Sequence, residues 1–188
     1  MATALSIREQ TAPMASRALD LLQECDVAQT RLQIVEDDHL QAMALLHGSI
    51  VDCQLVLSAL WTQAGMLDRL QPQADMENHL FPQGITHYTR KAGTGFSIVI
   101  DDLTALIEVA RGSSLVRDMD ALLSQLEEDK AHVEMRLELE QKSKLQTQQI
   151  AEEIDVLKQN IDDLFLEVEY ELKRLYRRNK KLIASFFR

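Results

Sequence analysis

The sequence predicts an all-α fold: an elongated coiled-coil or helical-bundle chain with two long helices and a short connecting helix. First, only 6 glycines and 3 prolines interrupt 188 residues, and helix-breaking residues this sparse favour long helices. Second, hydrophobic side chains recur at heptad spacing over two long stretches, 14–70 and 113–188, which indicates amphipathic helices. Third, a hydrophobic content of 46% and a charged content of 27% are near the usual values for folded proteins.

Residues 1–13 are predicted to be an N-terminal tail, and the first long helix is predicted over 14–70. It follows Pro13, a residue that a first helical turn tolerates. The two heptad series of this stretch continue past Gly48 and stop before Pro72. Gly48 could kink one helix or turn two shorter ones, and the uninterrupted frame favours one continuous or bent helix.

The first long helix loses its charges about half-way along. Between Leu40 and Leu67 the only formally charged side chain is Asp52, so several neighbours must bury this part. Other chains are expected to do so, although folding back of the C-terminal helix stays open. The residues predicted to contact partners are Met43, Leu46, Ile50, Val56, Leu57, Leu60, Trp61 and Leu67.

A connector is predicted over 71–97, because this stretch contains two prolines and three glycines. A loop of this length is expected to be either functional or disordered. Its segment RKAGTGFS does not match a phosphate-binding loop, since Lys91 precedes the glycines. A short helix is predicted over 98–112, begun by Ser97 or Asp101 and ended by Gly112.

The second long helix is predicted over 113–188, where no glycine or proline occurs. Between Leu126 and Ile150 the heptad seam is polar except at Val133, which indicates a solvated strut, a change of partner or a break. Complementary charges flanking the seam are sparse, so the pattern favours a hetero-oligomer or multi-helix bundle over a homodimer. The predicted contact residues are Ile154, Leu157, Ile161, Leu164 and Val168.

The sequence ends in a basic amphipathic segment, although the chain has a formal net charge of -10. Basic residues could simply stabilise a helix C-terminus, bind an acidic protein or filament, or contact an anionic membrane. Nucleic acid is not expected, because a strongly acidic chain repels phosphate. The predicted contact surface consists of Lys173, Arg174, Arg177, Arg178, Lys180, Lys181, Phe186 and Phe187.

Catalytic, cofactor and metal sites are not predicted. The five histidines lack metal-ligand spacing, and Cys25 and Cys53 are expected to be reduced core thiols. Paired carboxylates fall on outer helix faces. The apolar stretch 53–67 is too short and too rich in glutamine for a membrane span, and is expected to be a buried helix.

The sequence therefore predicts a non-enzymatic coiled-coil structural or adaptor subunit of a larger multiprotein assembly. A cytoplasmic, cytoskeleton-associated assembly is expected, either ciliary or axonemal or kinetochore-like, with other helical subunits as partners. The alternative is a subunit of a membrane-tethering or trafficking complex whose basic C-terminal helix contacts anionic lipid.

Overall fold

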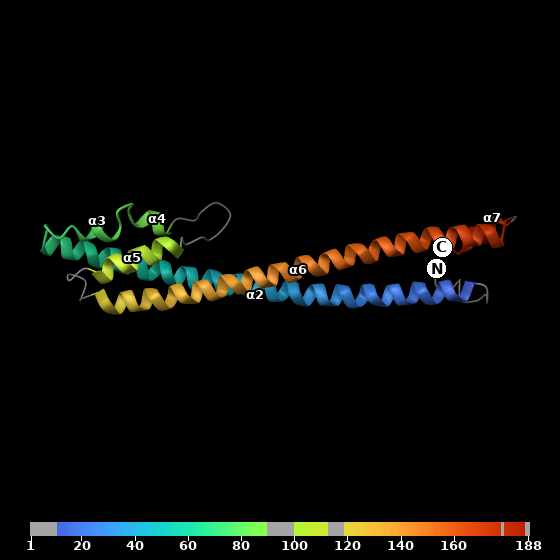
Figure 1. Ribbon diagram of the computed structural model, residues 1–188, viewed down its shortest axis with the longest axis horizontal. Helices are drawn as coiled ribbons and strands as arrows, with labels where there is room; N and C mark the ends of the chain where they lie inside the picture. Colours follow the sequence, from blue (N-terminus) through green and yellow to red (C-terminus); the bar gives the residue numbers. More distant parts are fainter. Residues whose placement is uncertain (1–10, 90–99, 113–118, 178, 187–188) are drawn as a thin grey trace. The chain divides into compact units, whose positions relative to one another are not determined.

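The computed structural model describes residues 11–89, 100–112, 119–177 and 179–186. All regular structure in these residues is helical, which confirms the all-α prediction. Arg178 and Phe187, both predicted contact residues, lie outside the described residues. The helices are α2 (Ala12–Leu70), α3 (Met76–Leu80), α4 (Ile85–Thr89), α5 (Ile100–Gly112), α6 (Asp120–Leu175) and α7 (Lys180–Ser185) (Figure 1).

The chain forms two compact units, each built from parts of both long helices. The terminal unit comprises residues 1–38 and 143–188, and the central unit comprises residues 39–142. Helix α2 is continuous through Gly48, the position where the sequence left a break open. Buried Ser49 and Ile50 directly follow this glycine, and their packing holds the helical backbone there.

The central unit has one hydrophobic core to which every helix in it contributes. Leu57 and Leu60 of α2 are fully buried, as are Leu103 of α5 and Leu123 of α6. Arg111 at the end of α5 donates through Nε and Nη2 to the Glu127 carboxylate of α6, both at 2.6 Å. This hydrogen-bonded pair lowers the pKa of the Glu127 carboxyl group.

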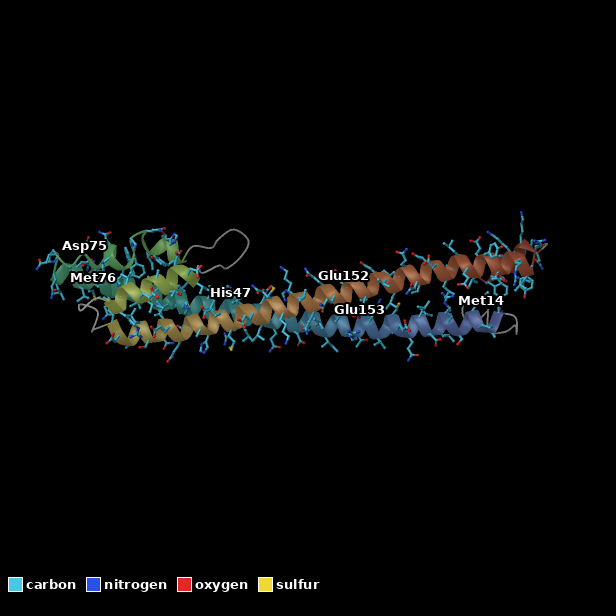
Figure 2. The ribbon with its side chains drawn as sticks, in the orientation of Figure 1. Met14, His47, Asp75, Met76, Glu152 and Glu153 are labelled. Carbon is cyan, nitrogen blue, oxygen red and sulfur yellow. The ribbon has the colours of Figure 1, made fainter. Side chains whose placement is uncertain are left out.

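Part of the predicted connector is folded. Two successive edge-to-face contacts join aromatic rings here. Trp61 of α2 contacts Phe81, which directly follows α3, and Phe81 contacts Tyr88 of α4, with ring centroids 5.3 and 5.4 Å apart. Helix α3 packs against α5, and its start follows Asp75, whose φ is 47° (Figure 2). The segment covers one side of the apolar half of α2. The sequence could not predict this packing, because a helix of five residues is too short to show a hydrophobic period.

Helix α3 takes its cap from another helix. Asp68, near the end of α2, accepts hydrogen bonds from the backbone N–H groups of Met76 and Glu77, at 2.5 and 2.8 Å. A carboxylate at a helix N-terminus satisfies unpaired N–H groups and complements the helix dipole. Asp68 therefore fixes the turn between α2 and α3.

The terminal unit is an antiparallel pair of long helical segments. Arg17 pairs with Glu167 at 2.6 Å and Arg31 pairs with Glu153 at 3.0 Å, so residue numbers rise on α2 as they fall on α6. Alanines of α2 lie buried opposite larger side chains of α6, and this size match lets the helices approach closely. The buried residues are Ala15, Ala18, Ala28, Ile150, Ile154, Leu164, Val168 and Leu172.

One expectation about the long helices is corrected, and another stays a prediction. In each unit one face of α2 is buried against segments of the same chain, and cover of its exposed residues by other chains stays a prediction. The correction is that α6 ends at Leu175, whereas one helix was expected over 113–188. Asn179 caps the separate helix α7 by accepting from the Leu182 N–H at 3.1 Å, and Phe186 then stacks on Tyr176 with ring centroids 6.2 Å apart.

Replacing the capping carboxylate tests whether this part of the connector is folded. We expect Asp68→Ala to cost about 1–2 kcal/mol of unfolding free energy, because two N–H groups of α3 lose their acceptor. Urea unfolding measures this cost, and hydrogen exchange should speed up at Met76 and Glu77. The matched control is Asp52→Ala on the same helix, whose side chain is exposed. Equal effects of the two substitutions would contradict the assigned cap.

Candidate protein-interaction surfaces

Most of the predicted partner-contact residues pack in, or against, the hydrophobic cores of this chain. Ile50, Leu57, Leu60, Leu164 and Val168 are at most 2% exposed. The structure therefore places them inside the two units and not on a free surface. Among the rest, Ile154 is also buried, Met43 is exposed, and those partly buried are Leu46, Val56, Trp61, Leu67, Leu157 and Ile161.

The polar part of the predicted seam is also used within the chain. Arg136 donates through Nη1 to the Leu45 carbonyl oxygen at 2.8 Å and to the Ser49 hydroxyl at 2.6 Å. The buried Asp129 accepts a hydrogen bond from Gln125 at 2.9 Å. The contacts of Arg136 with α2 fix which residues of the two helices lie opposite one another, whereas the Asp129 contact is made within α6. The polar seam residues of the central unit are therefore neither a solvated strut nor a break.

A groove runs along the two helices of the terminal unit, and we call it the seam groove. The Arg31–Glu153 ion pair contributes to both parts of its wall, and Figure 2 labels Glu153 on α6. Val27 and Ile34, which are 53% and 56% exposed, stand at its edge one heptad apart. The groove is lined by Asp20, Gln23, Glu24, Val27, Ala28, Arg31, Ile34, Val35, Gln146, Gln149, Ile150, Glu153 and Leu157.

The chemistry of the seam groove suits a third helix. Its floor contains the partly buried side chains Val35 and Leu157, and its edge carries carboxylates and amides. An apolar floor with a polar rim is the usual make-up of a protein interface. Sequence reasoning missed Val27 and Ile34 because they lie off the main seam; their spacing of seven residues was the available signal.

The basic end of the chain is only partly free. Lys173 pairs with Glu169 at 2.5 Å and Arg174 pairs with Glu171 at 2.8 Å, both within α6. No ion pair is found for the exposed Arg177, Lys180 or Lys181 within the described part of the chain. These three form what we call the basic end. Phe186, predicted as a contact residue, is instead 4% exposed within the core of the terminal unit.

One histidine and carboxylate pair invites a catalytic interpretation. His87 Nε2 of α4 lies 2.8 Å from Asp102 Oδ2 of α5. A hydrolytic site would also need a nucleophile beside the imidazole, but the neighbouring Thr89 hydroxyl donates to the Ile85 carbonyl oxygen. The pair instead joins the two helices, and no metal-binding group of side chains occurs among the described residues.

The Cys53 thiol is an inert core group. Burial, together with the charges of Asp129 and Asp52, raises the pKa of Cys53 from 9.0 to about 12. Its side chain is fully buried, whereas Cys25 is partly exposed, and both thiols are free. Because the thiolate is the reactive form, Cys53 is unsuited to catalysis or redox signalling.

No protein-family model, no curated protein and no solved structure matches the chain. The geometry of the two surfaces, the seam groove and the basic end, therefore has to carry any functional proposal.

Thiol labelling should separate the two cysteines. At pH 8 we expect a maleimide or disulfide reagent to modify Cys25 and leave Cys53 unmodified until urea unfolds the chain. A pKa of about 12 leaves a thiolate fraction of roughly one in ten thousand at that pH. The stability due to the neutral Cys53 thiol is complete below pH 9 and is lost as pH rises toward 12. Fast native labelling of Cys53, located by mass spectrometry, would refute this assignment.

Proposed function

We propose that this chain is a non-enzymatic coiled-coil structural or adaptor subunit of a larger cytoplasmic multiprotein assembly. The observation that carries the proposal is the seam groove, in which Val27 and Ile34 stay exposed along a heptad spacing. The two helices of the terminal unit bury one stripe each and leave this second one uncovered. A third helix from another subunit would complete the bundle.

A hetero-oligomeric partner is favoured over a second copy at the seam groove. The charged residues lining it are Asp20, Glu24, Arg31 and Glu153, and Arg31 is already paired with Glu153. The acids Asp20 and Glu24 are thus available to lysine or arginine on a partner helix. Electrostatic complementarity of this kind selects partners and sets their orientation, and an acidic copy of the same chain offers less of it.

Long helical subunits that bind one another side by side are typical of cytoskeletal machinery. We therefore place the assembly, as part of the same proposal, in a ciliary, axonemal or kinetochore-like structure. The absence of a family match leaves this setting dependent on the class of architecture alone.

The second candidate is a membrane-tethering or trafficking subunit. It is favoured by Arg177, Lys180 and Lys181, which form an exposed cationic surface, and by α2, which is long and apolar enough by composition to cross a membrane. Two observations weigh against it. Phe186 is buried and cannot anchor the tail in lipid, and the apolar half of α2 contributes Leu57 and Leu60 to a protein core.

Charge placed in the seam groove should remove the proposed partners. We expect Val27→Glu with Ile34→Glu to lose the proteins that co-purify with the tagged wild-type chain, as identified by crosslinking mass spectrometry. The double variant should keep its fold, since both side chains are more than half exposed. The control is Leu166→Glu with Tyr170→Glu, on exposed positions of α6 that do not line the groove. The proposal is wrong if both variants retain the same partners.

Charge reversal at the basic end should decide the membrane alternative. If the alternative holds, the wild-type chain floats with phosphatidylserine vesicles at low salt, and Arg177→Glu with Lys180→Glu and Lys181→Glu stays in the soluble fraction. Each basic residue near an anionic surface contributes about 1 kcal/mol of attraction. Substitution is preferable to truncation, because deleting the tail would also remove the buried Leu172 and Phe186. Failure of the wild-type chain to float would eliminate this alternative.

A further inference from the structure

An uncharged stripe runs along one exposed face of α2 in the central unit. Its residues follow one another at steps of three and four and lie within about 80° of the helix circumference. Leu55 and Met66 are 64% and 57% exposed, so no other part of the described chain covers them. We call this face the neutral stripe; it consists of Ala44, Gly48, Val51, Leu55, Ala59, Thr62 and Met66.

Gly48 is unexplained by the packing of the chain itself. A glycine inside a helix costs about 1 kcal/mol relative to alanine. At this position an added Cβ would meet nothing within 4 Å among the described residues. Neither a turn nor a close neighbour among the described residues therefore requires the glycine. A close approach by a second helix would require it, because only a small residue lets two helix backbones come together.

The hydroxyl groups on and beside the neutral stripe can be buried without losing a hydrogen bond. The Ser58 hydroxyl donates to the Gln54 carbonyl oxygen and the Thr62 hydroxyl donates to the Ser58 carbonyl oxygen, both at 2.8 Å. Covering the stripe would therefore leave neither donor without an acceptor, which is the usual cost of burying a hydroxyl group.

The side-chain sizes match when the stripe meets itself in antiparallel orientation. With a two-fold axis at Leu55, residues whose numbers sum to 110 face each other. Ala44 then faces Met66, Gly48 faces Thr62 and Val51 faces Ala59, so each small residue meets a larger one. A parallel arrangement would place each residue against its own copy and would leave gaps at the small positions.

Electrostatics limits the faces on which a second copy can pack. Residues 39–142 contain fifteen acidic and eight basic residues, so two central units repel each other over most of their surfaces. The neutral stripe is a face on which that repulsion is smallest. Its nearest formal charge, Asp52, would face Ser58 and lie about 9 Å along the axis from its own copy. The same acidic charge disfavours an anionic membrane.

We propose that the neutral stripe is an isologous dimer interface, in which a second copy of this chain packs antiparallel to the first with Leu55 at the two-fold axis. The contact is about 33 Å long and smaller than a standard interface of about 800 Å² per partner. A reversible, concentration-dependent dimer is expected. This inference is independent of the proposed function, because the seam groove belongs to the other unit.

Disulfide crosslinking tests the register directly in the full chain, in a Cys25→Ser background. We expect Leu55→Cys to form a crosslinked dimer on mild oxidation, because residue 55 meets its own copy. Ala44→Cys and Met66→Cys should crosslink when the two variants are mixed and poorly when each is alone. Met135→Cys, exposed on α6, is the control. Crosslinking at 55 no faster than at 135 would overturn the proposal.

Three further variants separate assembly from folding. Association is measured by analytical ultracentrifugation over a roughly hundredfold range of concentration. Leu55→Glu should leave a folded monomer, whereas Met135→Glu should dimerise like the wild type. Gly48→Ala should raise the melting temperature of the dilute chain by about 2–4 °C and weaken the dimer about tenfold, since the added methyl group opposes Thr62 of the partner copy. A wild-type chain that stays monomeric, or a dimer unaffected by Leu55→Glu, refutes the interface. Vesicle binding abolished by Leu55→Glu in a monomeric chain would show a lipid occupant instead.

Discussion

The central unit depends on one constraint: the half of α2 after residue 40 is apolar on more sides than a single helix can cover. Between Leu40 and Leu67 only Asp52 is formally charged, and burial of a large aliphatic side chain stabilises a fold by about 1.5–3 kcal/mol. The chain meets this constraint in part, with α6 on one side and with α3, α4 and α5 on others, all sharing one core with α2, while Leu55 and Met66 stay exposed. The short elements are held in place by two sets of contacts: the cap that Asp68 gives to α3 and the ring contacts of Trp61, Phe81 and Tyr88.

The terminal unit has fewer helices than the central unit, and they bury its apolar side chains less completely. Small residues such as Ala18 and Ala28 let α2 lie close to α6, and among the described residues only α7 and Phe186 add a further layer, at one end of the pair. Ion pairs, Arg17 with Glu167 and Arg31 with Glu153, bridge the edges of the pair. Exposed ion pairs of this kind contribute about 0–1 kcal/mol each. They therefore fix the orientation of the helices more than they stabilise them, and exposed apolar residues remain for a partner.

The sequence was sufficient for the fold class and for the long helices, because periodicity over many turns is a strong signal. It was insufficient wherever a single side chain decides the outcome. The cap that Asp68 gives to α3 joins residues eight and nine positions apart, and a five-residue helix has no period to detect. The heptad frame of α6 continues to Leu182 in the sequence, but α6 ends at Leu175 and Asn179 begins a separate helix. Periodicity likewise marks a buried face, such as that of Leu57 and Leu60, without telling whether the same chain or a partner buries it.

At the basic end, ion pairs within one helix reduce the number of charges that a partner could contact. In the sequence, a run of acids ends at Glu171 and a run of bases begins at Lys173, a pattern typical of a bipolar helix end that pairs with a partner helix. In the structure Glu169 and Glu171 neutralise Lys173 and Arg174 across a single helical turn. Pairs at this spacing form without any partner and contribute about 0.2–0.5 kcal/mol each. The charge left for recognition is therefore the smaller set beyond Leu175, and the turn at Asn179 presents it on a short helix whose apolar side is already packed against Tyr176 through Phe186. Among the described residues, the basic end therefore presents exposed charge and no exposed aromatic side chain.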